Sequence, residues 1–326
     1  MSARFRILAE KAVKSLPATS SFLKNRPDVE WIDDYQKFSK PTVTEEKRCI
    51  IFARKRGSWV KPFHCYNHSE FQYFSLDLAE GCLFDCVYCY LQSYLNHQAL
   101  VLFVPEPDLF SELRRLKGRC WISTGLLSDS LLAESCMPIL SKISREIPAE
   151  CLLELRSKSG DIDALRDPGI DRSRIVISWS LNPEIIASRY EYRAASPTDR
   201  LRAAHRVAEI GYRVGFHFDP VFHFSGWEKC YEGLIRRLED FAPDQIAFLS
   251  VGLFRYMPSL GTRIRNRFPY HEVLSGEFFP DQDGKYHYLR AIRKEMYRKF
   301  QFWMRDWQPR VPVFWSMEPQ PELIGG

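Results

Sequence analysis

The sequence lacks any hydrophobic run long enough to cross a membrane, which takes about 18 consecutive apolar residues. Its first ten residues, MSARFRILAE, also lack the apolar stretch and small-residue cleavage site of a secretory signal. We therefore expect a cytoplasmic protein with no membrane partner.

Low-complexity tracts and internal repeats are also missing from the 326 residues. Hydrophobic residues make up 45% and charged residues 27% of the chain, close to the averages for globular proteins. This composition excludes a disordered or fibrous protein. The length suits one domain of barrel size or two ordinary domains.

Nine cysteines are present, and their odd number without a secretory signal argues against a disulfide framework. Three of them, Cys82, Cys86 and Cys89, form a C-x3-C-x2-C motif. The other six are scattered among apolar neighbours, where a free cysteine usually packs as a small hydrophobic residue. The clustered cysteines therefore predict metal or redox chemistry.

The net charge of +5 is distributed unevenly. Residues 1–70 carry 14 Lys and Arg against 8 Asp and Glu, and residues 255–310 carry 12 against 6, whereas the middle of the chain is acidic. Two basic flanks are one way to bind the phosphates of a nucleic acid, especially where Arg alternates with aromatic residues as in 263–270. The alternative is a set of solvated helix faces.

From about residue 72, short apolar or β-branched runs alternate with segments of helical periodicity, the pattern of β-α units around a parallel sheet. The predicted strands are Tyr73–Leu78, Cys120–Ser123, Leu152–Leu155, Arg174–Ser180, Arg213–Phe218 and Gln245–Val251. The predicted helical segments are Val87–Asn96, Pro107–Leu116, Ser130–Ser144, Ile162–Arg166 with Pro183–Arg189, Pro197–Ile210 and Trp227–Phe241. Ser196-Pro197 has the residues of a helix N-cap followed by Pro at the first helical position.

This pattern predicts an α/β fold in three parts. Residues 1–70 show no such alternation and are expected to be a basic N-terminal extension. Residues 71–255 are expected to form an open, partial (β/α)6 barrel. Residues 256–326 are expected to form a C-terminal lobe with a helix from about Tyr286 to Trp307 and a strand at Val311–Trp315.

Three thiolates within eight residues can bind three irons of a [4Fe–4S] cluster and leave the fourth iron open. An open coordination position is typical of a catalytic metal site rather than a structural one. Two alternatives remain: a Cys3His zinc site that includes His97, and three unrelated core thiols.

The motif, with an aromatic residue before its last cysteine and a six-strand β-α array behind it, resembles the radical S-adenosylmethionine (SAM) superfamily. The resemblance implies that Cys82, Cys86 and Cys89 ligate a [4Fe–4S] cluster whose open iron binds SAM. It further implies reductive cleavage of SAM to a 5′-deoxyadenosyl radical that abstracts a hydrogen atom from the substrate. An external electron donor of the flavodoxin or ferredoxin type would supply the electron.

Further short motifs narrow this resemblance to the spore photoproduct lyase family over roughly residues 72–307. They recur in the family's order, and they are Cys89-Tyr-Leu-Gln92, Ser128-Asp129, Ser157-Lys158, Ser180-Leu-Asn182, Ser196-Pro197, 211–216, Pro220 and Gly226-Trp-Glu228 with Tyr231. The resemblance implies a lyase for DNA repair that acts on a thymine lesion or another nucleic-acid substrate.

Site residues follow from this resemblance position by position. It implies that SAM is held by Ser123, Lys158, Ser180 and Asn182. It also places Tyr88 and Tyr90 near the radical path and Arg255 against the substrate. For each of these residues the alternative is an ordinary polar group at a strand end or an aromatic residue that only packs.

One residue departs from the family pattern. The lyase ends its second strand with a cysteine that returns a hydrogen atom to the product radical, and this chain has Thr124 there. An alcohol O–H bond is too strong to replace a thiol in that step. Cys120 lies four residues back, about 13 Å along the strand, and is expected to pack in the core.

This departure keeps two other functions open. One is a radical SAM enzyme that acts on a free nucleotide or a small metabolite. The other is a nucleic-acid-binding protein whose iron–sulfur cluster is structural or redox-sensing.

Overall fold

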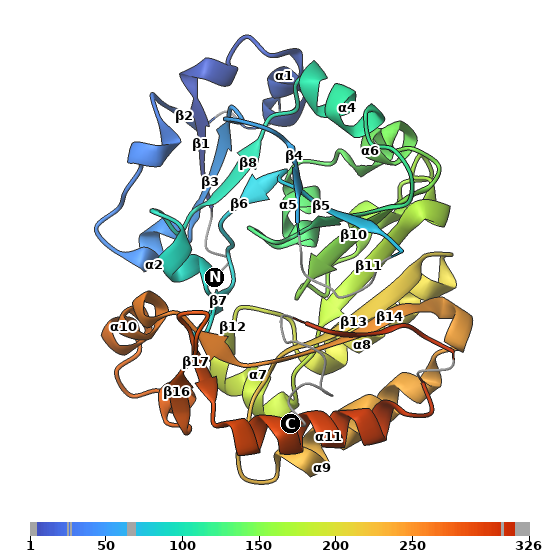
Figure 1. Cartoon of the computed structure of the whole chain (residues 1–326). Coiled ribbons are helices and arrows are strands. Elements are labelled where there is room, and N and C mark those ends of the chain that lie inside the picture. The colour runs from blue at the N-terminus through green and yellow to red at the C-terminus, as the bar shows by residue number, and fades with distance from the viewer. Residues whose placement is uncertain (1–4, 25, 27, 64–69, 308–309, 317–326) are drawn as a thin grey trace. The chain divides into compact units, whose positions relative to one another are not determined.

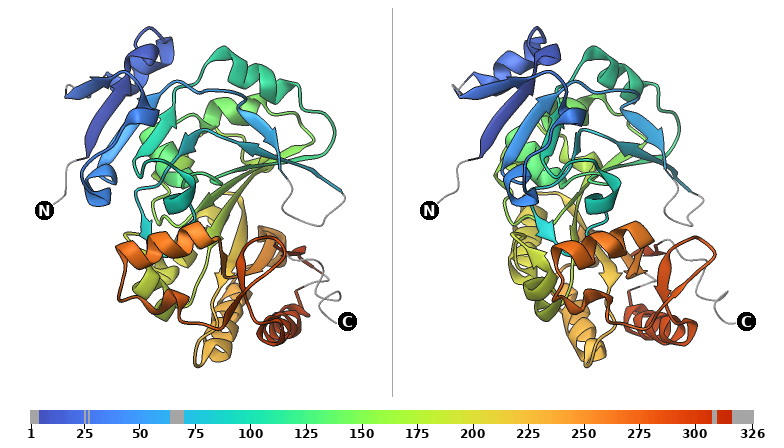
Figure 2. Two further views of the ribbon diagram at one scale, coloured as in Figure 1. Left: turned by 60° about the vertical axis from the view of Figure 1, so that its left-hand side comes forward. Right: turned by 90° about the vertical axis from the view of Figure 1, so that its left-hand side faces the viewer.

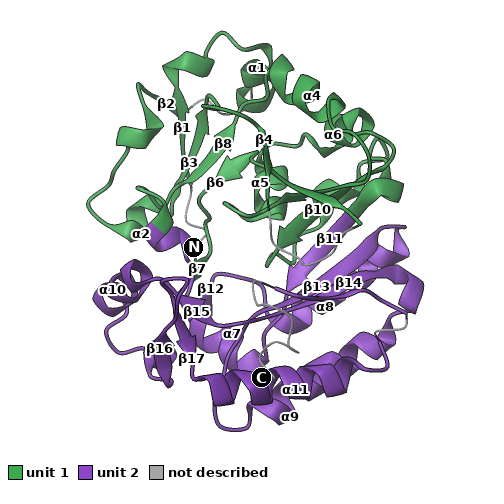
Figure 3. Ribbon diagram, viewed as in Figure 1, with its two compact units in different colours: residues 1–64, 70–85, 94–175 green, residues 65–69, 86–93, 176–326 purple. Residues whose placement is uncertain are grey.

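The three-cysteine segment lies where the chain divides into two units. The computed structural model describes residues 5–24, 26, 28–63, 70–307 and 310–316 (Figure 1). The first unit holds residues 1–64, 70–85 and 94–175, and the second holds residues 86–93 and 176–326 (Figure 3). Cys82 therefore belongs to the first unit, whereas Cys86 and Cys89 belong to the second.

A five-stranded sheet in the first unit contains most of what was expected to be an extension. Its order is β2 (Val29–Ile32), β1 (Arg6–Glu10), β3 (Cys49–Ala53), β8 (Leu100–Phe103) and β6 (Ala79–Glu80). Only β6 is antiparallel to its neighbour. Figure 2 shows the strands β1, β3 and β8 side by side. The expectation of an extension at 1–70 was therefore wrong.

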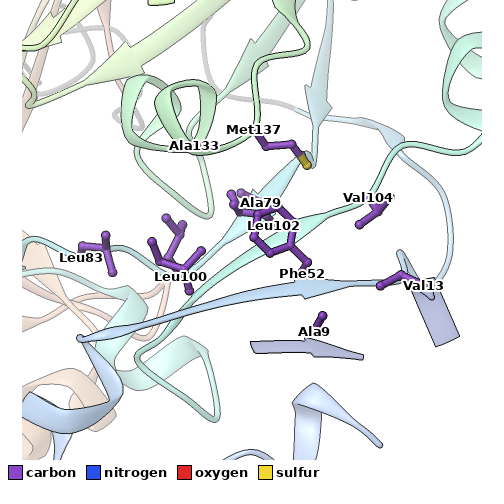
Figure 4. Packing of buried hydrophobic residues seen from close by; sticks show 11 residues of the cluster. Ala9, Val13, Phe52, Ala79, Leu83, Leu100, Leu102, Val104, Ala133 and Met137 are labelled. Carbon is purple, nitrogen blue, oxygen red and sulfur yellow. The ribbon is translucent and has the colours of Figure 1, made fainter. Parts of the chain in front are cut away.

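The core of this sheet explains why its strands are apolar. Every residue of β3 is buried, as expected for a parallel strand that is covered on both faces. Ala133 and Met137 lie above Ala79 and Leu102 in this core (Figure 4). The helices of this region, α1 (Pro17–Leu23) and α2 (Val43–Glu46), are short, so the sequence carries no sustained helical period that would reveal the β-α pattern.

The second sheet segment of the first unit carries three of the predicted barrel strands. Its order is β4 (Val60–Pro62), β5 (Gln72–Leu76), β9 (Cys120–Thr124) and β10 (Cys151–Ser157), with β5, β9 and β10 parallel. The helices here are α4 (Pro107–Arg114), α5 (Ser130–Cys136) and α6 (Leu140–Glu146). The helix predicted over Ser130–Ser144 is divided in two, because Pro138 cannot donate a helical hydrogen bond.

The second unit carries the other three predicted barrel strands. They are β11 (Ile175–Ser180), β13 (Arg213–Val221) and β14 (Ile246–Leu253), all parallel, followed by β18 (Val313–Trp315). The accompanying helices are α7 (Glu184–Tyr190), α8 (Pro197–Glu209) and α9 (Trp227–Arg236). The predicted N-cap of α8 is confirmed, because Ser196 Oγ accepts a hydrogen bond from Asp199 N at 3.1 Å.

A small antiparallel sheet and two helices complete the second unit. The sheet consists of β15 (Arg255–Tyr256), β17 (Tyr286–Tyr288) and β16 (Phe278–Pro280), and the helices are α10 (Pro258–Arg267) and α11 (Arg290–Met304). The predicted C-terminal helix is thus shorter than expected, since Tyr286–Tyr288 forms a strand. Within the described residues, no helix has the length and apolar character needed to cross a membrane.

The remaining elements are short. The helix predicted over Val87–Asn96 is reduced to α3 (Leu91–Tyr94), and β7 (Asp85–Cys86) and β12 (Glu191–Tyr192) form a two-stranded sheet. The 3₁₀ helices span Lys11–Val13, Tyr35–Lys37, Asp163–Arg166, Arg172–Arg174, Arg237–Asp240, Pro243–Gln245 and Glu272–Leu274.

The two units differ from the expected division at residues 70 and 255. Strand β3 pairs with β8, so residues before 70 share a sheet with residues after it. Strand β18 pairs with β14, so the C-terminal residues share a sheet with a barrel strand.

Candidate active site

The backbone around Cys82 is fixed from two sides. Gly81 has φ +77°, and a Cβ there would lie 1.8 Å from the carbonyl oxygen of Ala99, so only glycine fits. The buried ammonium of Lys47 donates hydrogen bonds to the carbonyl oxygens of Cys82 (3.0 Å) and Phe84 (2.6 Å). Lys47 lies in the segment expected to be an extension, and no motif around it signalled this contact.

The segment with Cys86 and Cys89 is closed by Gln92. The buried Gln92 carboxamide donates hydrogen bonds to the carbonyl oxygens of Cys86 (3.0 Å) and Val87 (2.8 Å), and it accepts one from Arg267. Cys86 is buried and Cys89 partly buried. Gln92 thus holds the turn between the two thiols.

The donor chemistry of this segment fits an iron–sulfur cluster. Cys82, Cys86 and Cys89 are thiols and not disulfides, and thiolates are the usual ligands of iron–sulfur clusters. No three His, Cys, Asp or Glu side chains of the described residues form a ready-made metal site. His97 is buried, its Nε2 lies 3.0 Å from Glu80 Oε1, and its Nδ1 has no hydrogen-bond partner among the described residues. A metal-binding His commonly has one ring nitrogen on a carboxylate, so the zinc alternative with His97 stays open.

In the second unit, a buried carboxylate joins three of the predicted residues. Glu191 accepts hydrogen bonds from the hydroxyl of Tyr88 and from Nδ2 of Asn182 at 3.0 Å. Arg200 donates to the other carboxylate oxygen at 2.5 Å and to the carbonyl oxygen of Ser180 at 2.8 Å. Tyr88, Ser180 and Asn182 therefore meet in one network.

Burial and charge shift the pKa values in this network. Burial, together with the negative charge of Glu191, raises the pKa of Tyr88 well above its usual value. Burial by itself would lower the pKa of Arg200, but the Glu191 carboxylate outweighs it and the pKa is raised. Tyr88 is therefore a neutral phenol and Arg200 a cation. Tyr90 differs from Tyr88, because 48% of its surface is exposed.

Sequence reasoning missed Glu191 and Arg200, although one signal was present. Arg200 occupies the same face of α8 as Ala203, Ala204 and Val207, all of which are buried. An arginine at an apolar helix position has to find a buried partner. Nothing local in the sequence identifies Glu191 as that partner.

In the first unit, Ser123 also bonds to a buried glutamate. Its Oγ donates to Glu154 Oε2 at 2.9 Å, and Nε1 of Trp121 donates to the same oxygen at 3.1 Å. Nε of Arg156 lies 3.5 Å from the other carboxylate oxygen. The side chain of Glu154 is fully buried, and that of Arg156 is 20% exposed.

Lys158 is positioned through its backbone. Its N–H donates to Asp129 Oδ2 at 2.7 Å, and Asp129 Oδ1 accepts from Ser157 Oγ (2.8 Å) and from Leu132 N (3.1 Å). Burial raises the pKa of Asp129, although the backbone N–H groups of Lys158 and Leu132 oppose this shift. Asp129 thus ties the end of β10 to the first turn of α5.

Comparison with known proteins identifies the family. The family model described as "Spore photoproduct lyase" matches residues 63–288. The chain belongs to the spore photoproduct lyase family. It is accordingly a member of the radical SAM superfamily, as its cysteine motif indicated.

Relatives within the family are distant in sequence. Spore photoproduct lyase of Clostridium acetobutylicum is 26% identical over 204 residues, which cover 60% of each chain. That of Geobacillus sp. is 28% identical over 179 residues, which cover 51% of this chain and 50% of the relative. The chain therefore matches half to three-fifths of the length of these curated relatives.

Solved structures of spore photoproduct lyase share the fold over nearly the whole chain. One complexed with dinucleoside spore photoproduct has a TM-score of 0.81 and 20% identity, covering 94% of this chain and 97% of that chain. A mutant with bound AdoMet and dinucleoside spore photoproduct also has a TM-score of 0.81, covering 95% and 98%. The predicted α/β fold with a partial radical SAM barrel is confirmed.

Thr124 departs from the family pattern and is committed to other contacts. Its hydroxyl lies 2.8 Å from Ser130 Oγ and donates to the carbonyl oxygen of Glu154 at 3.1 Å. It pairs in register with Leu155, whereas Ser123 pairs with Glu154. Neighbouring residues of a strand alternate between its faces, so Thr124 and Ser123 lie on opposite faces of β9. Thr124 lies on the side of α5.

Both basic flanks contain ion pairs. In the N-terminal flank they join Arg6 to Glu30, Lys11 to Asp33, Arg54 to Glu106 and Arg56 to Asp34. In the C-terminal flank they join Lys285 to Asp283, Arg293 to Asp281, Lys299 to Glu228 and Arg305 to Asp306. Arg255 is partly buried and donates to the carbonyl oxygen of Leu253 at 2.9 Å. Arg263 and Arg265, exposed on α10, are the better candidates for phosphate contacts.

Proposed function

We propose that this chain is a radical SAM lyase that acts on a thymine lesion in DNA. The observation that carries the proposal is the intact C-x3-C-x2-C motif, with all three cysteines as thiols, in a chain of the spore photoproduct lyase family. Solved lyase structures of the same fold hold AdoMet and dinucleoside spore photoproduct, which supports the choice of cofactor and substrate.

Cys82, Cys86 and Cys89 would hold a [4Fe–4S] cluster through three irons. When bound, the cluster and SAM supply a 5′-deoxyadenosyl radical that abstracts a hydrogen atom, with the electron taken from an external flavodoxin or ferredoxin. Such a donor and a DNA substrate are both found in the cytoplasm, where we place the reaction.

The chain's own polar residues would hold and orient SAM. Lys158 offers a cation for the methionine carboxylate, and Ser123, Ser180 and Asn182 offer hydrogen-bonding groups for the carboxylate and the ribose. Tyr88 and Tyr90 would lie near the radical path. Their environments differ, since the Tyr88 hydroxyl donates a hydrogen bond to Glu191 while Tyr90 is partly exposed.

Anaerobic reconstitution tests the cluster. We expect about four iron per chain and an EPR signal that changes when SAM is added. Each of C82A, C86A and C89A should lose the cluster and all 5′-deoxyadenosine formation. C230A is the matched control, because Cys230 is also a partly buried thiol but lies on α9 outside the motif. A native, colourless protein that binds only zinc would refute the proposal.

Spore-photoproduct DNA and undamaged DNA test the substrate. Thymine recovery together with 5′-deoxyadenosine would establish the lyase reaction and a hydrogen donor other than Thr124. Slow cofactor cleavage without repair would favour a free nucleotide or small metabolite as substrate. The Thr124 hydroxyl, which contacts Ser130 and the Glu154 carbonyl, would then have no part in hydrogen-atom return. No cleavage of SAM, with DNA binding intact, would favour a binding protein with a structural or redox-sensing cluster.

DNA binding is tested by its dependence on salt. A plot of the logarithm of the binding constant against the logarithm of the salt concentration should have a slope of about −0.9 for each phosphate contacted. Replacing Arg263 and Arg265 by Ala should flatten the slope, whereas R6A with K11A should not, because those two cations are paired with Glu30 and Asp33. R255A should lower turnover more than affinity.

A further inference from the structure

Glu191 lies at the centre of a buried network that connects three separate parts of the second unit. Its hydrogen-bond donors come from the cysteine turn (Tyr88), from the segment after β11 (Asn182) and from α8 (Arg200). Glu191 is 4% exposed, and Asn182 and Arg200 are fully buried. One carboxylate thus sets the relative placement of all three elements.

The network leaves the Asn182 carboxamide one orientation. Tyr231, fully buried, donates its hydroxyl to Asn182 Oδ1 at 2.8 Å, while Nδ2 of Asn182 donates to Glu191. A flipped amide would place Nδ2 against the Tyr231 hydroxyl and its oxygen against the carboxylate. The tyrosine hydroxyl is itself fixed, because it accepts from Phe222 N at 2.9 Å.

The network also reaches the cysteine turn through the backbone. Val87 N donates to the carbonyl oxygen of Tyr190, the residue before Glu191, at 2.8 Å. Tyr88 therefore contacts the Glu191 segment through its side chain while its neighbour does so through the main chain. Both contacts fall between the two ligand candidates Cys86 and Cys89.

A buried ion pair is a poor way to gain stability alone. The cost of removing both charges from water is large, and well-packed apolar residues often replace such a pair without loss. What apolar residues cannot replace is the geometry of three directed hydrogen bonds. The Glu191–Arg200 pair is therefore better explained by the groups that it orients.

We propose that Glu191 is a positioning residue, held by Arg200, that fixes the Cys86–Cys89 turn through Tyr88 and the amide orientation of Asn182 towards SAM. This inference rests on the proposed function. It assigns to Glu191 and Arg200 no contact with SAM, cluster or substrate. Groups that orient metal ligands from outside the ligand set typically affect affinity or activity by about 10- to 100-fold.

The test uses the full-length double variant Glu191→Leu/Arg200→Met, which removes the pair without leaving one charge buried alone. We expect a folded protein with normal iron content and a lowered unfolding temperature, because Tyr88, Asn182 and the Ser180 carbonyl each lose a buried partner. Its affinity for S-adenosylhomocysteine should fall by about 10- to 100-fold, and its reduced EPR signal should broaden. The matched control is Tyr288→Phe, which removes a buried hydroxyl of the same unit that accepts from His223 N at 3.1 Å.

Unchanged affinity and EPR signal in the folded double variant would overturn the inference and leave the pair a purely structural role. If that variant does not fold, Tyr88→Phe and Tyr231→Phe replace it. The first should broaden the EPR signal and the second should weaken S-adenosylhomocysteine binding, and normal behaviour of both would overturn the inference. A wild-type protein that binds neither iron nor S-adenosylhomocysteine would instead refute the proposed function.

Discussion

The first and second units each bury a glutamate, Glu154 and Glu191, but they neutralise its charge differently. Each buries a glutamate that accepts a hydrogen bond from a residue expected to hold SAM, Ser123 in one case and Asn182 in the other. Glu191 bonds to Arg200 at 2.5 Å with both side chains fully buried. Glu154 lies 3.5 Å from Arg156, whose side chain is 20% exposed.

We call the Glu191–Arg200 network closed and the Glu154–Arg156 network open. In the closed network, the cation is committed to the carboxylate, and solvent does not reach either charge. In the open network, solvent reaches the cation, so the ion pair is weaker and Arg156 retains access to solutes. Another buried carboxylate, Glu134 on α5, is held by backbone N–H groups of Ile139 and Leu140, each at 2.9 Å.

The largest effect is expected when the closed network loses its cation. Arg200→Met leaves Glu191 charged and buried, which should lower the free energy of unfolding by about 3–5 kcal/mol. Arg202→Met is the control on the same helix, because Arg202 pairs with Asp199 at the surface and should cost only about 0.5 kcal/mol. Urea unfolding measures both, and similar losses would contradict the distinction between buried and exposed pairs.

A carboxylate held by backbone groups should respond to pH. The pKa of Glu134 is raised from 4.5 to about 7, mainly by burial and slightly by Asp167, against the lowering effect of the Leu140 and Ile139 hydrogen bonds. Between these pH values the folded state holds a proton that the unfolded state has lost. The resulting stability is fully present below pH 4.5 and is lost as pH rises through about 7, by about 3 kcal/mol in all.

Glu134→Gln should remove this pH dependence, because a glutamine side chain does not titrate. Its oxygen can still accept hydrogen bonds from Ile139 and Leu140. Unfolding curves at pH 5 and pH 8 measure the difference between variant and wild type. Glu150→Gln, at an exposed position, is the control and should leave the dependence unchanged. A wild-type pH dependence that survives in Glu134→Gln would show that other groups cause it.

The barrel strands were predictable because each is a short segment rich in apolar, β-branched or aromatic residues between segments of helical periodicity. The predicted strand Arg213–Phe218 lies within β13, for example, and Cys120–Ser123 lies within β9. The N-terminal sheet was missed because its strands of four or five residues are joined by helices too short to show a period. Strand existence thus follows from local sequence only where the flanking elements are long.

Site residues divide in a similar way. Ser180 and Asn182 were named from the family resemblance, and the structure brings them together with Tyr88, while their contact with SAM stays a prediction. Glu154 and Glu191 were missed because their roles depend on partners from other elements, 31 residues away in sequence for Ser123 and 103 for Tyr88. Contacts across such separations leave no local pattern.

Removing the Ser123 hydroxyl from the open network should lower the free energy of unfolding by less than the Arg200 or Glu134 changes do. Ser123→Ala takes a neutral donor from a buried carboxylate, and a hydrogen bond to a charged group contributes about 2 kcal/mol. Ser135→Ala, which removes a more exposed hydroxyl 3.4 Å from Asp161, is the control. A loss well below 1 kcal/mol in urea unfolding of Ser123→Ala would indicate that water replaces the hydroxyl.

The smallest effect is expected from the open network's cation, and it completes the comparison with Arg200. Arg156→Met should lower the free energy of unfolding by about 1 kcal/mol or less, because the pair is separated by 3.5 Å and partly solvated. Urea unfolding at low and high salt measures this, and the small loss should shrink as salt screens the pair. A salt-independent loss as large as that of Arg200→Met would mean that Glu154 depends on Arg156 as Glu191 does on Arg200, and the two networks would then be equivalent.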